Sequence, residues 1–114
     1  MPRLISFDID GTLEVGDPPG CVTMRMVRVV KELGYIIGSC SDRMVSNQQR
    51  IWRDHDIAVQ FTVLKHQLDT VKADFEAESY YHIGDTNIDR QYAQRAGFEF
   101  FLPDSAVTYF WLPT

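Results

Sequence analysis

Short apolar runs alternate with longer amphipathic stretches along the 114-residue chain. Runs of four to six apolar residues that stop at a polar residue or glycine predict strands buried in a sheet. Apolar residues spaced three or four apart predict helices with one apolar face. The predicted strands are residues 4–7, 35–40, 61–64, 80–83 and 98–102. The predicted helices are residues 21–33, 45–54, about 68–75 and 88–96, with Gly97 ending the last one.

The first predicted helix shows the spacing most clearly. Val22, Met26, Val30 and Leu33 are separated by four, four and three residues, and Gly34 follows as an expected C-terminal cap. These apolar residues are expected to form the buried face of the helix. The stretch 14–20 holds glycines, prolines and acids, a composition typical of a loop.

Strands that alternate with helices in this rhythm predict right-handed βαβ units. We therefore expect an α/β fold, a Rossmann-like three-layer sandwich with a mostly parallel five-stranded sheet covered on both faces. A length of 114 residues is enough for one domain, so residues 1–114 are expected to form a single unit. In such sheets ligands bind beyond the carboxyl ends of the strands, where the apolar runs stop.

Composition narrows the classes of partner. Hydrophobic residues make up 45% and charged residues 24%, which excludes a disordered or low-complexity chain. The net charge of −5 argues against broad attraction to nucleic acid or to anionic membranes. No apolar run has the length of a membrane span. Cys21 and Cys40 lack the spacing of zinc ligands, so we expect buried thiols in a reducing, cytoplasmic protein.

Two carboxylates directly follow the first predicted strand. Asp8 and Asp10 are two residues apart, so on an extended chain their side chains point the same way. Their mutual repulsion would be relieved by a shared proton or by a hard divalent cation such as Mg²⁺. Gly11 permits a sharp turn there, which would expose backbone N–H groups, including that of Thr12, to an anion.

The other predicted strands also end at polar residues. Asp85 and Asp89 follow the fourth strand, Ser41 follows the second and Lys65 follows the third. A hydroxyl and an ammonium group are suited to binding phosphoryl oxygens. Ser39 competes with Ser41 for this role and Lys72 competes with Lys65, although Lys65 directly follows the strand and Lys72 is expected to be solvated.

These motifs together resemble those of phosphatases of the haloacid dehalogenase-like superfamily. The residues concerned are DIDGTL at positions 8–13 and GDTNID at positions 84–89, with Ser41 and Lys65 between them. The resemblance covers residues 4 to about 102. It implies that Asp8 is a nucleophile that forms an aspartyl-phosphate and that Asp10 is the general acid and base. It also implies that Asp8, the Asp10 carbonyl and Asp85 hold Mg²⁺, with Asp89 supporting the site from alongside or through water.

The same resemblance raises the question of a cap, because many members of the family carry an inserted cap domain. Residues 13–22 and 41–65 leave no room for one, so a small capless member with an open site is expected. Its substrate would be a phosphorylated small molecule or macromolecule. The aromatic residues Tyr109, Phe110 and Trp111 would either pack on the sheet edge or serve as a lid or a homo-oligomer interface.

Three alternatives to a general phosphatase stay open. One is a catalytically weak binding or regulatory module, which the intact Asp8, Asp10 and Asp85 disfavour. Another is a phosphatase acting on nucleic-acid ends. The last is a phospho-accepting receiver domain, whose acceptor would end the middle strand while an acid pair follows the first strand. The acids at positions 85 and 89 fit that pattern poorly.

Overall fold

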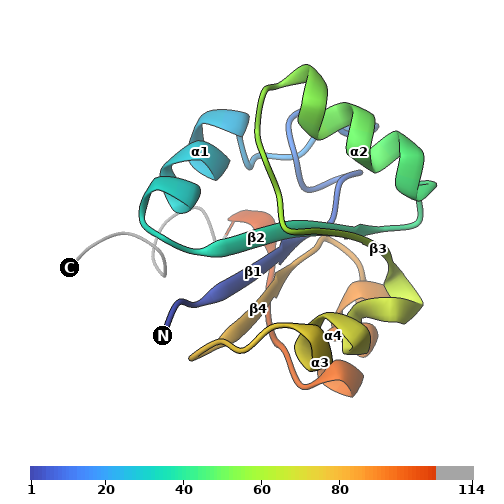
Figure 1. Ribbon diagram of the computed structural model, residues 1–114. Helices are drawn as coiled ribbons and strands as arrows, with labels where there is room; N and C mark the ends of the chain where they lie inside the picture. Colours follow the sequence, from blue (N-terminus) through green and yellow to red (C-terminus); the bar gives the residue numbers. More distant parts are fainter. Residues whose placement is uncertain (105–114) are drawn as a thin grey trace.

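A five-stranded parallel sheet forms the centre of the protein in a computed structural model that describes residues 1–104 (Figure 1). The strands are β1 (Leu4–Phe7), β2 (Ile36–Ser41), β3 (Phe61–Leu64), β4 (Tyr80–Ile83) and β5 (Glu99–Phe101). The helices are α1 (Met24–Glu32), α2 (Val45–Asp54), α3 (Leu68–Asp74) and α4 (Asn87–Ala96), and a short 3₁₀ turn, η1 (Lys65–Gln67), precedes α3. The predicted alternation of strands and helices is therefore confirmed.

The strand order is β3-β2-β1-β4-β5, and every described pair of neighbouring strands is parallel. Helices α1 and α2 cover one face of the sheet, and α3 and α4 cover the other (Figure 1). The result is a Rossmann-like three-layer sandwich, with a sheet that is wholly rather than mostly parallel in the described residues. The order reverses between β1 and β4, and such a reversal is where ligands bind in open sheets of this kind.

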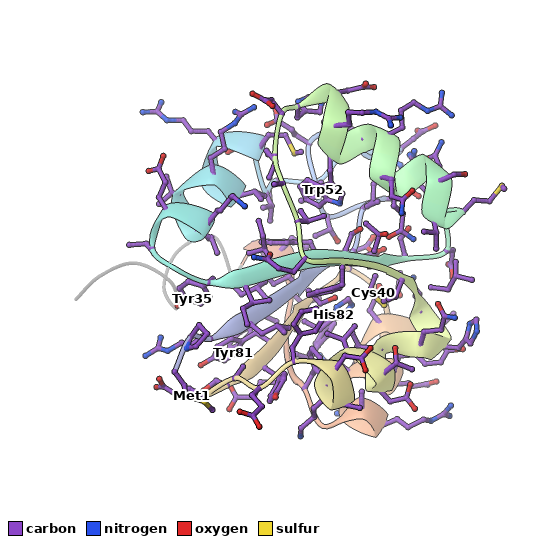
Figure 2. All side chains as sticks on the ribbon, in the orientation of Figure 1. Met1, Tyr35, Cys40, Trp52, Tyr81 and His82 are labelled. Atoms are coloured by element: carbon purple, nitrogen blue, oxygen red, sulfur yellow. The ribbon has the colours of Figure 1, made fainter. Side chains whose placement is uncertain are left out.

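The residues of β1 explain why this strand is central. All four of its side chains are fully buried, because successive residues face opposite helical layers. Ile5 and Phe7 pack in the cluster that contains Trp52, whereas Leu4 packs in the cluster that contains Cys40. Figure 2 shows Trp52 on the side of α1 and α2, and Cys40 on the side of α3 and α4.

Helix α1 is shorter than predicted at both ends. Thr23 caps its N-terminus by accepting a hydrogen bond from the Met26 N–H at 3.1 Å, so the helix begins at Met24 rather than at residue 21. Its buried face consists of Met24, Val27 and Val30. The predicted face was therefore wrong at its C-terminal end, where Leu33 is 44% exposed.

The start of that predicted helix is an extended segment. Val22 is buried as expected, but it forms an isolated parallel bridge with Leu13 instead of belonging to the helix. This bridge closes the loop between β1 and α1 and leaves Cys21 exposed. The expectation of a buried Cys21 thiol was thus wrong, whereas Cys40 is fully buried.

The C-terminal half follows the prediction more closely. Gly97 ends α4 with a φ of 79°, in the left-handed region that favours glycine. The last strand covers three residues instead of five. The aromatic segment 106–112 lies outside the described residues. Within residues 1–104, none of the helices has both the length and the apolar character needed to cross a bilayer.

Candidate active site

Asp8 lies at the carboxyl end of the central strand. Its backbone N–H donates to the Ile83 carbonyl at 2.9 Å, which continues the pairing of β1 with β4 by one residue. A cavity of about 230 Å³ opens at this edge of the sheet. Its lining residues come from the last residue of β2 and from the segments that follow β1, β2, β3 and β4, and they are Asp8, Asp10, Pro18, Ser41, Asp42, Lys65, Asp85 and Thr86.

Lys65 is the buried cation of this site. It begins η1 directly after β3, and its side chain is 9% exposed. Its Nζ lies 3.9 Å from Asp8 Oδ2, 3.4 Å from Asp89 Oδ1 and 3.4 Å from Asp42 Oδ2. Burial alone would lower the pKa of Lys65, but the three carboxylates outweigh it and hold that pKa above its usual value. Lys65 is therefore a fixed positive charge beside Asp8.

The surroundings of Asp8 disfavour its ionised carboxylate. Burial, followed by the negative charge of Asp89, raises the pKa of Asp8 from 3.8 to about 8, although Lys65 opposes the shift. Such a carboxylate gains from a bound cation or from a proton. One oxygen each of Asp8, Asp85 and Asp89 lies within 4.8 Å of the others, so this group could hold a metal ion.

The three carboxylates differ in how many of their oxygens already contact a hydrogen-bond donor or a cation. Asp89 is fully buried, and its Oδ1 contacts His82 Nε2 at 3.2 Å and Lys65 Nζ at 3.4 Å. Its Oδ2 accepts hydrogen bonds from the Thr86 hydroxyl at 2.7 Å and from the Thr86 N–H at 3.3 Å. Asp85 is exposed and lines the cavity. The donor set thus fits a hard cation held by Asp8 and Asp85, with Asp89 orienting the site.

Asp89 stays ionised despite its burial. Burial favours the neutral acid, but the contacts with His82, the hydrogen bonds from Thr86 and the charge of Lys65 together lower the pKa of Asp89 to about 2. His82 is held in turn by Ser6, whose Oγ lies 3.0 Å from Nδ1. His82 is buried on the α3 and α4 side of the sheet (Figure 2) and is not among the residues that line the cavity.

Asp10 is paired with an arginine that the sequence analysis did not single out. Arg43 Nη2 donates to Asp10 Oδ1 at 2.6 Å, and Arg43 Nε lies 3.2 Å and 3.1 Å from Oδ1 and Oδ2. The Asp17 N–H also donates to Oδ1 at 2.8 Å. The hydrogen bonds from Arg43 lower the pKa of Asp10. Oδ2 is the less occupied oxygen, so it is the one available for proton transfer.

A buried network supports the loop that carries Ser41 and Arg43. Gln48 is fully buried in α2, and its Nε2 donates to the Arg43 carbonyl at 2.8 Å. Its Oε1 accepts from the Ser39 hydroxyl at 2.6 Å, and Ser39 Oγ in turn accepts from Trp52 Nε1 at 3.0 Å. The Ser39 hydroxyl therefore makes its hydrogen bonds within this buried network, whereas Ser41 lines the cavity.

The two lysines also differ in place. Lys65 lines the cavity, while Lys72 is exposed and donates to the Gly97 carbonyl at 3.2 Å. Lys72 Nζ also lies 5.3 Å from the centre of the Tyr80 ring. Of the two serines and the two lysines that competed in the sequence, Ser41 and Lys65 therefore line the cavity.

The backbone N–H groups of Gly11 and Thr12 donate hydrogen bonds within the loop that follows β1. The Gly11 N–H donates to the Pro18 carbonyl at 2.7 Å, and the Thr12 N–H donates to the Ile9 carbonyl at 3.1 Å. Gly11 has a φ of 76°, in the left-handed region that favours glycine, and a Cβ there would displace the Asp85 carboxylate. The Thr12 side chain is fully buried, and its Oγ1 has no hydrogen-bond partner in the structure. Neither residue belongs to the cavity lining.

Sequence reasoning missed the site residues Asp42 and Arg43, and also Pro18 and Thr86, which line the cavity. Asp42 lines the cavity and Arg43 holds Asp10, and both follow Ser41 at the carboxyl end of β2. That position was the signal available in the sequence, since the loop after a strand end faces the ligand site.

Comparison with known proteins does not assign the chain to a family. No protein-family model and no curated protein matches the sequence. The resemblance to haloacid dehalogenase-like phosphatases therefore depends on the sequence motifs alone. The observed strand order does bear on one alternative, because receiver domains have the order 2-1-3-4-5 and this sheet does not.

Proposed function

We propose that this protein is a Mg²⁺-dependent phosphatase that hydrolyses a phosphate monoester through an aspartyl-phosphate on Asp8. The observation that carries the proposal is the pairing of buried Asp8 with buried Lys65 at one cavity, with Asp10, Ser41 and Asp85 around it. The motifs at positions 8–13 and 84–89 support the same assignment. A nucleophile, an acid and a phosphoryl-binding cation are the groups that this reaction needs.

In the first step, an Asp8 oxygen attacks the phosphorus atom, and the bond between phosphorus and the ester oxygen breaks. Asp10 in its protonated form, a minor form near neutral pH because Arg43 lowers its pKa, gives that proton to the departing oxygen, so the alcohol leaves neutral. Lys65 and the Ser41 hydroxyl offset the charge on the transferring phosphoryl oxygens. In the second step, Asp10 takes a proton from water as the water attacks phosphorus, inorganic phosphate leaves, and the Asp8 carboxylate is restored.

The metal ion fits this scheme through the donors already described. Asp8 and Asp85 would hold it with the Asp10 carbonyl, and Asp89 would orient Lys65 from beneath. When bound, Mg²⁺ would neutralise charge between the nucleophile and the phosphoryl group. Its carboxylate ligands must be ionised, so metal affinity should rise with pH as Asp8 loses its proton.

The proposed enzyme belongs to the small capless type of the haloacid dehalogenase-like family, with an open site. The experiment is hydrolysis of phenyl phosphate by wild type, by Asp8→Asn and by Asp54→Asn, an exposed carboxylate at the end of α2 that serves as control. Activity that needs Mg²⁺, persists in the control and is lost in Asp8→Asn supports the proposal. Equal activity of wild type and Asp8→Asn would overturn it.

A further inference from the structure

Asp42 stands at the mouth of the cavity without a role in the chemistry proposed above. Its side chain is 82% exposed, and its Oδ2 lies 3.4 Å from Lys65 Nζ. It lines the cavity together with Asp8, Asp10 and Asp85. The leaving group of a phosphoryl group bound at Lys65 would therefore share this cavity with the Asp42 carboxylate.

The neighbouring cation does not offset this charge. Arg43 follows Asp42 in the chain, but its guanidinium donates to both oxygens of Asp10 and to Asn47 Oδ1 at 2.9 Å. The Asp10 carboxylate thus already balances the Arg43 charge. Lys65 is shared among three carboxylates. Asp85 is a proposed ligand of the metal ion, so Asp42 is the exposed lining carboxylate whose charge neither the metal nor Arg43 would offset.

Apolar groups complete the same edge of the sheet. Met44 precedes the first residue of α2, and Ile88 is the second residue of α4, so both follow strands whose carboxyl ends form the site. Their side chains are 73% and 55% exposed. Pro18 lines the cavity itself. Met44 and Ile88 do not line the cavity, so a leaving group there would meet the Asp42 carboxylate and, of these apolar residues, Pro18.

We propose that Asp42 is a specificity-determining residue that selects phosphate monoesters whose leaving group carries no negative charge. This inference rests on the proposed phosphatase function and names its substrate class, the phosphate esters of a neutral or cationic alcohol or phenol. A phosphorylated nucleic-acid end falls in the disfavoured class, because its neighbouring phosphate groups are anionic.

The expected size of the effect follows from Coulomb's law. A leaving-group carboxylate roughly 6 Å from Asp42, in the high dielectric of an open site, should lose about three- to tenfold in kcat/KM. Added salt should shrink this penalty, since exposed charges are screened. Asp42 also pairs with Lys65, but that effect acts on the phosphoryl group that all substrates share. The ratio between two substrates therefore isolates the effect on the leaving group.

The test compares three aryl phosphates built on one frame: phenyl phosphate, 3-carboxyphenyl phosphate and 3-(aminomethyl)phenyl phosphate. Each is assayed with Mg²⁺ at low and high salt on wild type, Asp42→Asn and the exposed control Asp54→Asn, which removes the same charge far along α2. Intrinsic reactivity of the esters cancels when one pair of substrates is compared between proteins.

We expect Asp42→Asn to raise kcat/KM for the carboxylate ester relative to phenyl phosphate by about three- to tenfold at low salt. For the aminomethyl ester the relative change should be in the opposite direction, and the control should keep both wild-type ratios. Unchanged ratios in Asp42→Asn, with active enzyme, overturn the role of Asp42 alone. Failure of wild type to hydrolyse any of the three esters overturns the phosphatase function, and this inference with it.

Discussion

Replacing Asp8 with asparagine should stabilise the metal-free protein. Asp8 is 3% exposed, its nearest cation, Lys65, is shared with Asp89, and burial together with the Asp89 charge raises the pKa of Asp8 to about 8. A carboxyl whose pKa is higher in the folded state favours folding most at low pH. That contribution is lost as the pH rises from the unfolded value of 3.8 through the folded value of about 8.

The magnitude follows from the part of the shift that lies below neutral pH. About 3 pH units separate 3.8 from pH 7, which corresponds to up to roughly 4 kcal/mol of lost unfolding free energy. An asparagine of almost the same shape cannot ionise, so Asp8→Asn should recover a large share of this loss. Bound Mg²⁺ should instead stabilise wild type more than Asp8→Asn. At about 100 times its Kd it should stabilise wild type by about 2.7 kcal/mol, and it should stabilise Asp8→Asn less.

Urea unfolding measured by circular dichroism, with chelator and with Mg²⁺, between about pH 4 and pH 8, tests this reasoning. The expected result is a gap between Asp8→Asn and wild type that widens with pH in chelator and narrows in Mg²⁺. Asp54→Asn, at an exposed position, should follow wild type. If Asp8→Asn were less stable than wild type at neutral pH without metal, the electrostatic strain assigned to Asp8 would be refuted.

Three further outcomes are expected from neighbouring residues. Asp10→Asn should slow hydrolysis of esters with poor leaving groups by about 10²–10⁴-fold while Mg²⁺ still stabilises the protein; turnover at the wild-type rate would reassign the acid. Arg43→Gln should raise the pKa of Asp10, because Arg43 lowers that pKa in wild type. The alkaline limb of the kcat/KM profile should therefore move to higher pH, and an unmoved limb would contradict the pairing of Arg43 with Asp10. His82→Leu should lower the free energy of unfolding by about 1–3 kcal/mol, because it leaves the buried Asp89 carboxylate without that partner, and denaturant titration showing no loss would contradict the network.

The sequence alone was enough to predict that Asp8, Asp85 and Lys65 lie at one edge of the sheet. Asp8, Asp85 and Lys65 each follow an apolar run, and the carboxyl ends of parallel strands meet at the same edge. The order of the strands was not needed for that inference. The alternation of strands and helices predicted the layers for the same reason.

The contacts within the site could not be predicted in this way. The Ser6 contact with His82 depends on the register of β1 against β4, in which these two residues are partners. The pairing of Arg43 with Asp10 depends on side-chain conformations in two loops that are 33 residues apart. Helix α1 shows the same limit locally, because it begins after the cap at Thr23 rather than at residue 21, and Leu33 at its end is exposed.

Trapping of the covalent intermediate tests the central claim most directly. Wild-type protein is mixed with phenyl phosphate and Mg²⁺, quenched in acid and reduced with borohydride, which converts an aspartyl-phosphate into homoserine. Mass spectrometry of the peptide that contains Asp8 then locates the modified position. The proposed function predicts reduction at Asp8 only when substrate and Mg²⁺ are both present, and none after chelation. Sustained release of phosphate with an unmodified Asp8 peptide, or reduction at another carboxylate instead, would contradict it.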